Sequence, residues 1–178
     1  MELWDAYDQD GRLLGFDLVR GEPMPEGVWH MVVEVYAVTT GGQVLVTKRH
    51  PDKPWGDHWE ITGGAVLKGE TPVEGALREL REETGIRVTA DQLHPVYVQA
   101  RRGIDGLSTI YNSFLVFFAP EEQTICLQEG ETVDYRLLSY EAYRQFVRTE
   151  EFTTPVGKRF LDHQALFDRL MAEHVNEK

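Results

Sequence analysis

The chain has 178 residues, of which 42% are hydrophobic and 11% aromatic; this composition excludes a disordered protein and fits one domain with a substantial core. Its formal net charge of −12 argues against a nucleic-acid-binding protein with a broad basic surface. The single cysteine, Cys126, excludes an intrachain disulfide, and we expect it to be a small buried residue.

Segments that target proteins to membranes are not evident in the sequence. Residues 1–5 contain neither the basic part nor the apolar part of a secretion signal. The longest apolar run, residues 114–119, is far too short to span a bilayer. These features predict a cytoplasmic protein with no membrane partner.

The chain alternates between strand-like and helix-like patterns. Asp10-Gly11 is a strong hairpin signal between the first two strands, and residues 17–27 form a connector rich in glycine and proline. Strands are predicted at 2–8, 13–19, 28–39, 43–49, 59–62, 93–99, 109–119 and 132–138, and helices at 72–84, 140–147 and 155–174. The β-branched residues of 28–39 and 43–49 indicate central strands covered on both faces. This alternation predicts a mixed sheet between helices.

The helix at 72–84 has clear start and stop signals. Thr71 is a good N-cap, Pro72 suits the first helical position, and Glu74 completes a capping box. Gly85 supplies the left-handed residue that ends the helix. The residues at helical spacing that we expect to be buried are Val73, Leu77, Leu80 and Thr84.

A second face of this helix is acidic. Glu79, Glu82 and Glu83 are spaced at i, i+3 and i+4, so their carboxylates project from one patch. Such a patch provides the oxygen ligands that Mg²⁺ prefers, but acidic helix faces are often simply solvated. The spacing alone does not decide between the two interpretations.

The longer pattern around this helix decides between them. It reads Gly, five residues, Glu, seven residues, then Arg-Glu-Leu-x-Glu-Glu-x-Gly-Ile, and it resembles the Nudix box. The nine matching positions are Gly64, Glu70, Arg78, Glu79, Leu80, Glu82, Glu83, Gly85 and Ile86.

The resemblance implies a fold and a metal site. It implies a Nudix-type α/β/α sandwich with a mixed sheet and an N-terminal β-hairpin. Residues 1–178 would form one domain, with the hairpin and connector at 1–27 and the core at 28–178. It also implies that Glu79, Glu82 and Glu83 hold Mg²⁺ or Mn²⁺ together with the Gly64 carbonyl, and that Glu70 pairs with Arg78.

The N-terminal hairpin and the segments 28–30 and 44–49 are similar to the Nudix branch related to isopentenyl diphosphate isomerase. His30 matches one isomerase ligand. The positions of the isomerase cysteine, a metal-binding histidine and an acidic pair hold residues that cannot replace them: Gly63, Ala65, Tyr111 and Ser113. Isomerase activity therefore stays an alternative that these residues disfavour.

The intact box favours metal-dependent hydrolysis of a diphosphate linkage in a nucleotide or nucleoside diphosphate derivative. A non-catalytic nucleotide-sensing module is a further alternative, which the retained carboxylates disfavour. The expected catalytic residues are Glu82, Glu83, Glu131, Arg78 and Glu70. The general base is open among Glu82, Glu83, Glu131, Glu129 and Asp105.

Substrate choice is weakly encoded. Arg49 is a candidate for phosphate contact, whereas Arg101 and Arg102 fit surface residues better. Trp55 and Trp59 are candidates for stacking on a base, although a Trp59 buried in the core fits the pattern equally well. The expected partner is a small diphosphate compound rather than a nucleic acid, and a homodimer is possible.

Overall fold

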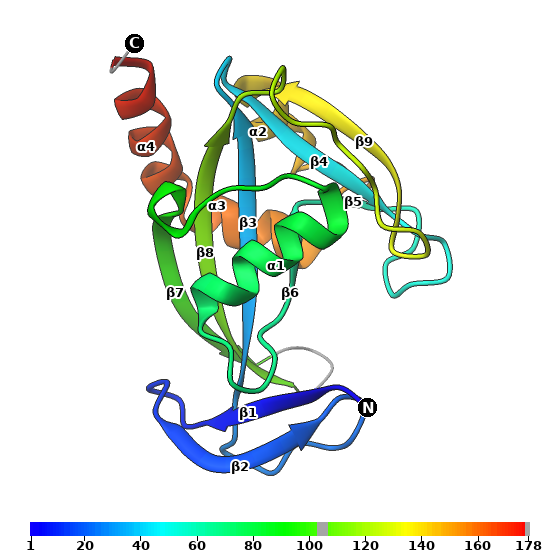
Figure 1. Cartoon of the computed structure of the whole chain (residues 1–178), viewed down its shortest axis with the longest axis vertical. Helices are drawn as coiled ribbons and strands as arrows, with labels where there is room; N and C mark the ends of the chain where they lie inside the picture. Colours follow the sequence, from blue (N-terminus) through cyan, green and yellow to red (C-terminus); the bar gives the residue numbers. More distant parts are fainter. Residues whose placement is uncertain (103–106, 177–178) are drawn as a thin grey trace.

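The computed structural model describes residues 1–102 and 107–176 (Figure 1). In chain order its elements are β1 (Leu3–Tyr7), β2 (Leu13–Val19), β3 (His30–Thr39), β4 (Gln43–Arg49), β5 (Trp59–Glu60), β6 (Thr62–Ala65), α1 (Pro72–Thr84), η1 (Ala90–Gln92), β7 (His94–Arg102), β8 (Ser108–Phe118), β9 (Thr132–Ser139), α2 (Tyr140–Phe146), α3 (Thr154–Asp162) and α4 (Gln164–Asn176). No helix in these described ranges is long and apolar enough to cross a membrane.

The main sheet is mixed, as predicted. Its order is β5-β4-β3-β8-β7, with β6 also pairing with β3 and β9 with β4. β3 runs parallel to β8 over ten consecutive residue pairs, from His30 opposite Thr109 to Thr39 opposite Phe118. The other strand pairs are antiparallel. β3 is therefore the central strand from which the rest of the sheet is built.

Helices cover both faces of this sheet (Figure 1). Because side chains alternate along a strand, Val33 and Val35 of β3 pack in the cluster that contains Leu80 of α1. Tyr36 points to the opposite face and packs with Phe160 of α3 and Phe167 of α4. The helix α1 therefore packs on the face of the sheet that carries Val33 and Val35.

A buried ion pair ties β3 to α3. Arg159 donates to Glu34 through Nε, at 2.8 Å, and through a terminal guanidinium nitrogen, and the Tyr97 hydroxyl also donates to Glu34, at 2.6 Å. The guanidinium lies 3.8 Å from the ring centre of Tyr111. Backbone pairing then places Glu34 opposite Gly63 of β6, so this network supports the strand that carries the glycines.

Three predicted boundaries were wrong. The helix expected at 155–174 is two helices, because His163 leaves helical geometry and its ring stacks on Tyr97 with ring centres 3.8 Å apart. The strand expected at 59–62 is two short strands, because β5 pairs with β4, whereas β6 starts at Thr62, continues to Ala65 and pairs with β3. β7 extends to Arg102, beyond the expected end at residue 99.

The N-terminal hairpin of β1 and β2 is fixed to the loop between β6 and α1. Trp4 and Leu18 of its inner face pack near Leu67. The Gly69 amide donates to Asp5 at 2.7 Å, and the Lys68 ammonium donates to Asp17 at 2.6 Å. The hairpin therefore has a defined position next to the box loop.

Candidate active site

The local signals that define α1 are confirmed. The Thr71 hydroxyl accepts from the Glu74 amide, and Glu74 accepts from the Thr71 amide, which completes the capping box. Gly85 ends the helix with φ of +76°. Leu80 and Thr84 are buried as expected, whereas Val73 and Leu77 are only half-buried.

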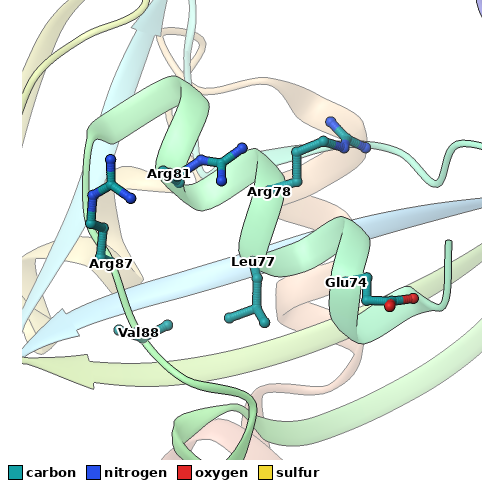
Figure 2. A pocket seen from close by; sticks show the side chains of 6 residues that line it. All are labelled: Glu74, Leu77, Arg78, Arg81, Arg87 and Val88. Carbon is teal, nitrogen blue, oxygen red and sulfur yellow. The ribbon is translucent and has the colours of Figure 1, made fainter.

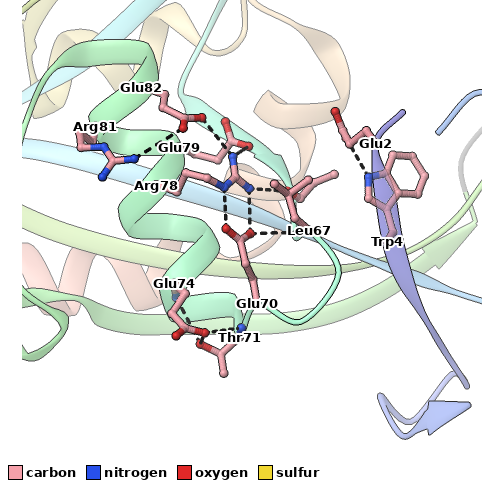
Figure 3. Close-up of polar contacts among 11 residues, drawn as sticks. Glu2, Trp4, Leu67, Glu70, Thr71, Glu74, Arg78, Glu79, Arg81 and Glu82 are labelled. Atoms are coloured by element: carbon pink, nitrogen blue, oxygen red, sulfur yellow. Dashed lines mark hydrogen bonds and ion pairs between the residues drawn. The ribbon is translucent and has the colours of Figure 1, made fainter. Parts of the chain in front are cut away.

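Arg78 contacts several other residues of the site through its guanidinium group (Figure 3). Its guanidinium donates to both Glu70 oxygens, at 2.7 and 3.0 Å, and to the Ala65 carbonyl at 2.9 Å. It also contacts Glu79 at 2.7 Å and Glu82 at 3.3 Å. The expected contact between Glu70 and Arg78 is therefore present, and it ties the loop before α1 to the middle of the helix.

Glu79 and Gly64 fit each other closely. A Cβ atom added at Gly64 would lie only 2.2 Å from Glu79 Oε1, so only glycine leaves room for this carboxylate. Burial raises the pKa of Glu79, although the neighbouring Arg78 opposes this effect. The Glu79 carboxylate is thus held against the backbone that the resemblance assigns to metal binding.

Glu83 is the most deeply buried of the three helix carboxylates, with 8% of its surface exposed. It accepts a 3.3 Å hydrogen bond from the Gly63 amide. Burial raises its pKa well above the ordinary value, and the charges of Glu60 and Glu79 raise it further. A cation next to Glu83 would relieve this unfavourable charge.

The donor set of three carboxylates and the Gly64 backbone suits a hard divalent ion. In the described residues, no three acidic, histidine or cysteine side chains come together closely enough to hold an ion. Glu79 and Glu82 accept hydrogen bonds from the Arg78 guanidinium.

A cavity of about 750 Å³ opens over the three carboxylates, within the size range of small-molecule sites. Arg49 lines it from the end of β4 and Lys53 from the loop that follows. Gln128 and Glu131 line it from the segment before β9. The hairpin closes it from another side. Acidic and basic side chains thus face the same space.

The candidates for the general base lie in different surroundings. Glu131 lines the cavity and forms an ion pair with Lys53. Glu129 is exposed and does not line the cavity. Asp105 lies outside the described residues. Among the residues before β9, the geometry therefore favours Glu131 over Glu129.

The three candidates for substrate contact differ in whether they line the cavity. Arg49 lines the cavity, pairs with Glu60 and donates to the Pro54 carbonyl at 2.7 Å. Trp55 is 43% exposed but lies outside the cavity lining. Trp59 is 2% exposed, with the Arg136 guanidinium 4.1 Å from its ring centre. The base-stacking interpretation of Trp59 was wrong, because core packing covers its ring.

Two other surface expectations can be compared with the structure. Cys126 is exposed, not buried, because it belongs to the irregular segment that follows β8. Arg101 pairs with Asp162 of α3, and Arg102 is exposed, so neither lines the cavity.

A second hollow, of about 330 Å³, lies beside α1 (Figure 2). Leu77 and Val88 form its apolar part, and Arg81 and Arg87 are its exposed cations. Its acidic residue, Glu74, is engaged in the helix cap. This hollow lacks the cluster of three carboxylates that lines the main cavity, so it does not provide a comparable set of metal ligands.

Sequence reasoning missed several residues of the main cavity and its support. Lys53 forms an ion pair with Glu131. Glu60, which does not line the cavity, forms an ion pair with Arg49. Glu2, Trp4 and Arg20 reach the cavity from the hairpin, more than forty residues before the box. No local motif marks these residues, because only the tertiary fold brings them to the site.

The comparison with protein families identifies the fold. A model of the NUDIX domain matches residues 28–161, well over half of the chain. The chain belongs to the Nudix family. Its α/β Nudix fold combines the mixed sheet with a two-stranded N-terminal hairpin.

Two Listeria proteins are similar in sequence. The Nudix hydrolase lmo0368 of Listeria monocytogenes is 39% identical over 90 residues, which cover 49% of this chain and 53% of that protein. The Nudix hydrolase lin0387 of Listeria innocua is 30% identical over 155 residues, which cover 85% of this chain and 88% of that protein. This Nudix chain is thus a Nudix hydrolase homologue, and these matches give no support to the isomerase-related branch.

Solved structures share the Nudix fold at low sequence identity. DR0079 from Deinococcus radiodurans is 22% identical with a TM-score of 0.68, over 85% of this chain and 92% of that one. A bifunctional NMN adenylyltransferase/ADP ribose pyrophosphatase from Francisella tularensis, complexed with AMP and a Mn ion, is 21% identical with a TM-score of 0.59. That match covers 88% of this chain and 43% of the Francisella protein.

Proposed function

We propose that this chain hydrolyses a diphosphate linkage in a nucleotide or nucleoside diphosphate derivative, with a divalent metal ion as cofactor. The observation that carries the proposal is the shared cavity, where the three α1 carboxylates lie together with the cations Arg49 and Lys53. Carboxylates attract metal ions and cations attract phosphates, so one cavity provides both halves of a metal–diphosphate site.

The proposed metal ligands are Glu79, Glu82, Glu83 and the backbone at Gly64. The fit of Glu79 against the glycine supports this assignment, because it sets that carboxylate beside the Gly64 backbone in the cavity lining. The raised pKa of Glu83 supports it too, because a cation would stabilise this buried carboxylate. When bound, Mg²⁺ or Mn²⁺ would neutralise phosphate oxygens and lower the pKa of a bound water. The ion in the Francisella relative is Mn.

The remaining residues position the reactants. Arg78 holds Glu70 and the Ala65 carbonyl, which keeps the glycine strand beside the helix. Arg49 and Lys53 are placed to contact phosphate oxygens that carry negative charge. Glu131, held by Lys53, is our preferred general base, with Glu82 and Glu83 as the other candidates.

The test is a panel of nucleoside diphosphates, triphosphates, dinucleotides and nucleotide sugars, each incubated with Mg²⁺, Mn²⁺ or a chelator. Phosphorus-31 NMR would identify the products, and ¹⁸O-labelled water would show whether water oxygen enters a product phosphate. We expect metal-dependent cleavage with ¹⁸O incorporation for at least one class. Binding of nucleotides without cleavage would instead identify a sensing module.

Isopentenyl diphosphate belongs in the same panel. We expect no conversion to the dimethylallyl isomer, because Gly63 and Ala65 provide neither an acid nor a metal ligand. Enzyme-dependent isomerisation would overturn the proposed reaction.

A further inference from the structure

The N-terminal hairpin forms one wall of the cavity and contributes Glu2, Trp4 and Arg20 to it. Contacts of the hairpin with Lys68 and Gly69 of the box loop hold this wall in place. Figure 3 shows Glu2 and Trp4 across Leu67 from the Arg78 cluster. Glu2 and Glu79 line the same cavity, so the wall faces the space into which the proposed metal ligands project.

The aromatic residues of the described cavity lining do not offer a stacking surface. Trp4 is 7% exposed, and its ring stacks on His30 with ring centres 4.4 Å apart and planes inclined by 18°. His30 is 4% exposed and forms a 2.9 Å hydrogen bond with Thr109. Since a nucleobase is held best on an exposed aromatic face, this wall is poorly suited to a base.

The accessible groups of the wall are polar. The Arg20 guanidinium donates to Glu2 at 2.8 Å, and the Trp4 indole donates to the other Glu2 oxygen at 2.8 Å. These two hydrogen bonds outweigh burial and lower the pKa of Glu2, so its carboxylate stays an acceptor. A carboxylate has about four lone-pair sites and a guanidinium five N–H groups, so both groups retain hydrogen-bonding capacity.

This combination matches a particular ligand group. The charges of Glu2 and Arg20 cancel each other, so the wall does not select a charged group. It presents acceptors and donors side by side, which complements neighbouring hydroxyl groups that both donate and accept. An apolar chain at the same place would cover the remaining hydrogen-bonding capacity of both charged groups without satisfying it, which is costly when water is excluded.

We propose that Glu2 and Arg20 bind the hydroxyl groups of a sugar attached to the diphosphate, and that the hairpin is thereby a specificity determinant of the cavity. The inference rests on the proposed function, because it assumes that the diphosphate binds at the α1 carboxylates. It names the substrate class as nucleoside diphosphate sugars.

The test uses two ligands of equal charge, ADP-ribose and the β-methyl ester of ADP, which lacks the terminal sugar. Arg20→Ala and Glu2→Gln should each raise KM for ADP-ribose at least about tenfold, as expected for a lost hydrogen bond to a charged group. KM for the methyl ester and kcat for both compounds should stay within about twofold. Arg20→Lys should recover part of the ADP-ribose affinity.

Arg12→Ala is the matched control, because Arg12 is an exposed arginine of the same hairpin that pairs with Asp10 and does not line the cavity. It should leave both KM values unchanged. Equal changes for the two ligands, or no change for ADP-ribose, would overturn the role of the hairpin. Thermal unfolding of each variant would show that the fold is intact.

Calorimetric binding of both ligands in the presence of Mn²⁺ separates the two proposals. If the wild-type protein binds ADP-ribose but cleaves neither compound, the proposed hydrolysis fails and the Kd ratios of the variants still test the hairpin. If it cleaves both compounds and Arg20→Ala does not alter their ratio, only the hairpin inference fails. If the wild-type protein binds neither compound, the hairpin inference fails, whereas the proposed hydrolysis is decided by the nucleotide panel.

Discussion

The substitution Gly64→Ala should reduce catalytic turnover much more than it reduces the stability of the fold. The new Cβ atom would lie 2.2 Å from Glu79 Oε1 and 2.4 Å from Glu79 Cδ. The carboxylate would have to retreat by more than about 1 Å to reach ordinary contact distance. Because misplacement of a reacting group by 1 Å can cost about a hundredfold in rate, we expect kcat to fall by about that factor.

The same substitution should have a moderate effect on stability. Its main loss is the 2.7 Å contact between Glu79 and Arg78, a charge-assisted hydrogen bond of about 1.5–3 kcal/mol. For a chain of this size that corresponds to a Tm lower by about 3–12 °C. Arg78 would retain Glu70 as a partner. Steady-state kinetics with Mn²⁺ and thermal unfolding by circular dichroism measure the two effects.

Two other glycines provide controls. At Gly63 the added Cβ would lie 2.4 Å from the backbone oxygen of Val33, so Gly63→Ala should disrupt the pairing of β3 with β6 and destabilise the fold more than Gly64→Ala. At Gly41 the nearest atom, in Thr39, is 3.6 Å away, so Gly41→Ala should be nearly neutral. A Gly64→Ala protein that keeps kcat within threefold of the wild type would refute this reasoning.

Glu83→Gln should reduce turnover at least about a hundredfold, measured by the same kinetics; an unchanged rate would remove Glu83 from the proposed site. In metal-free protein, the raised pKa of Glu83 means that the folded state binds more protons than the unfolded state, so Tm should fall as pH rises above the ordinary glutamate value of 4.5. Glu83→Gln should flatten that pH dependence, and an identical slope would contradict the assigned cause. Arg78→Lys should cost about 2–3 kcal/mol in chemical denaturation, because lysine cannot reproduce the fork to Glu70 and Ala65. The exposed Cys126 should react fully with a thiol reagent in native protein, and a protected thiol would contradict its exposure.

The features of α1 that could be predicted are those encoded within a few residues. Thr71, Glu74 and Gly85 define the helix ends through contacts at most four residues away, so the sequence pattern was sufficient. The contact between Glu70 and Arg78 was predicted from the resemblance to the Nudix box. The hydrophobic patterns likewise placed most strands, because burial on a sheet follows their alternation.

The features that could not be predicted depend on contacts between distant segments. The break at His163 accompanies its stacking on Tyr97, about 65 residues earlier in the chain. Trp55 and Trp59 have the same side chain and differ only in what covers them, which the sequence does not encode locally. Glu2 and Arg20 reach the cavity through the hairpin, and no spacing relative to the box reveals this.

The parallel pairing of β3 with β8 has a consequence for synthesis of the chain. The strands pair across 79 residues, and the buried contact between Glu34 and Arg159 spans 125. On the ribosome, α1 emerges before β8, so the nascent helix meets only half of the sheet that later supports it. We expect a fragment that ends before residue 108 to show no cooperative unfolding transition, and chaperones to protect its exposed apolar residues until the C-terminal strands arrive.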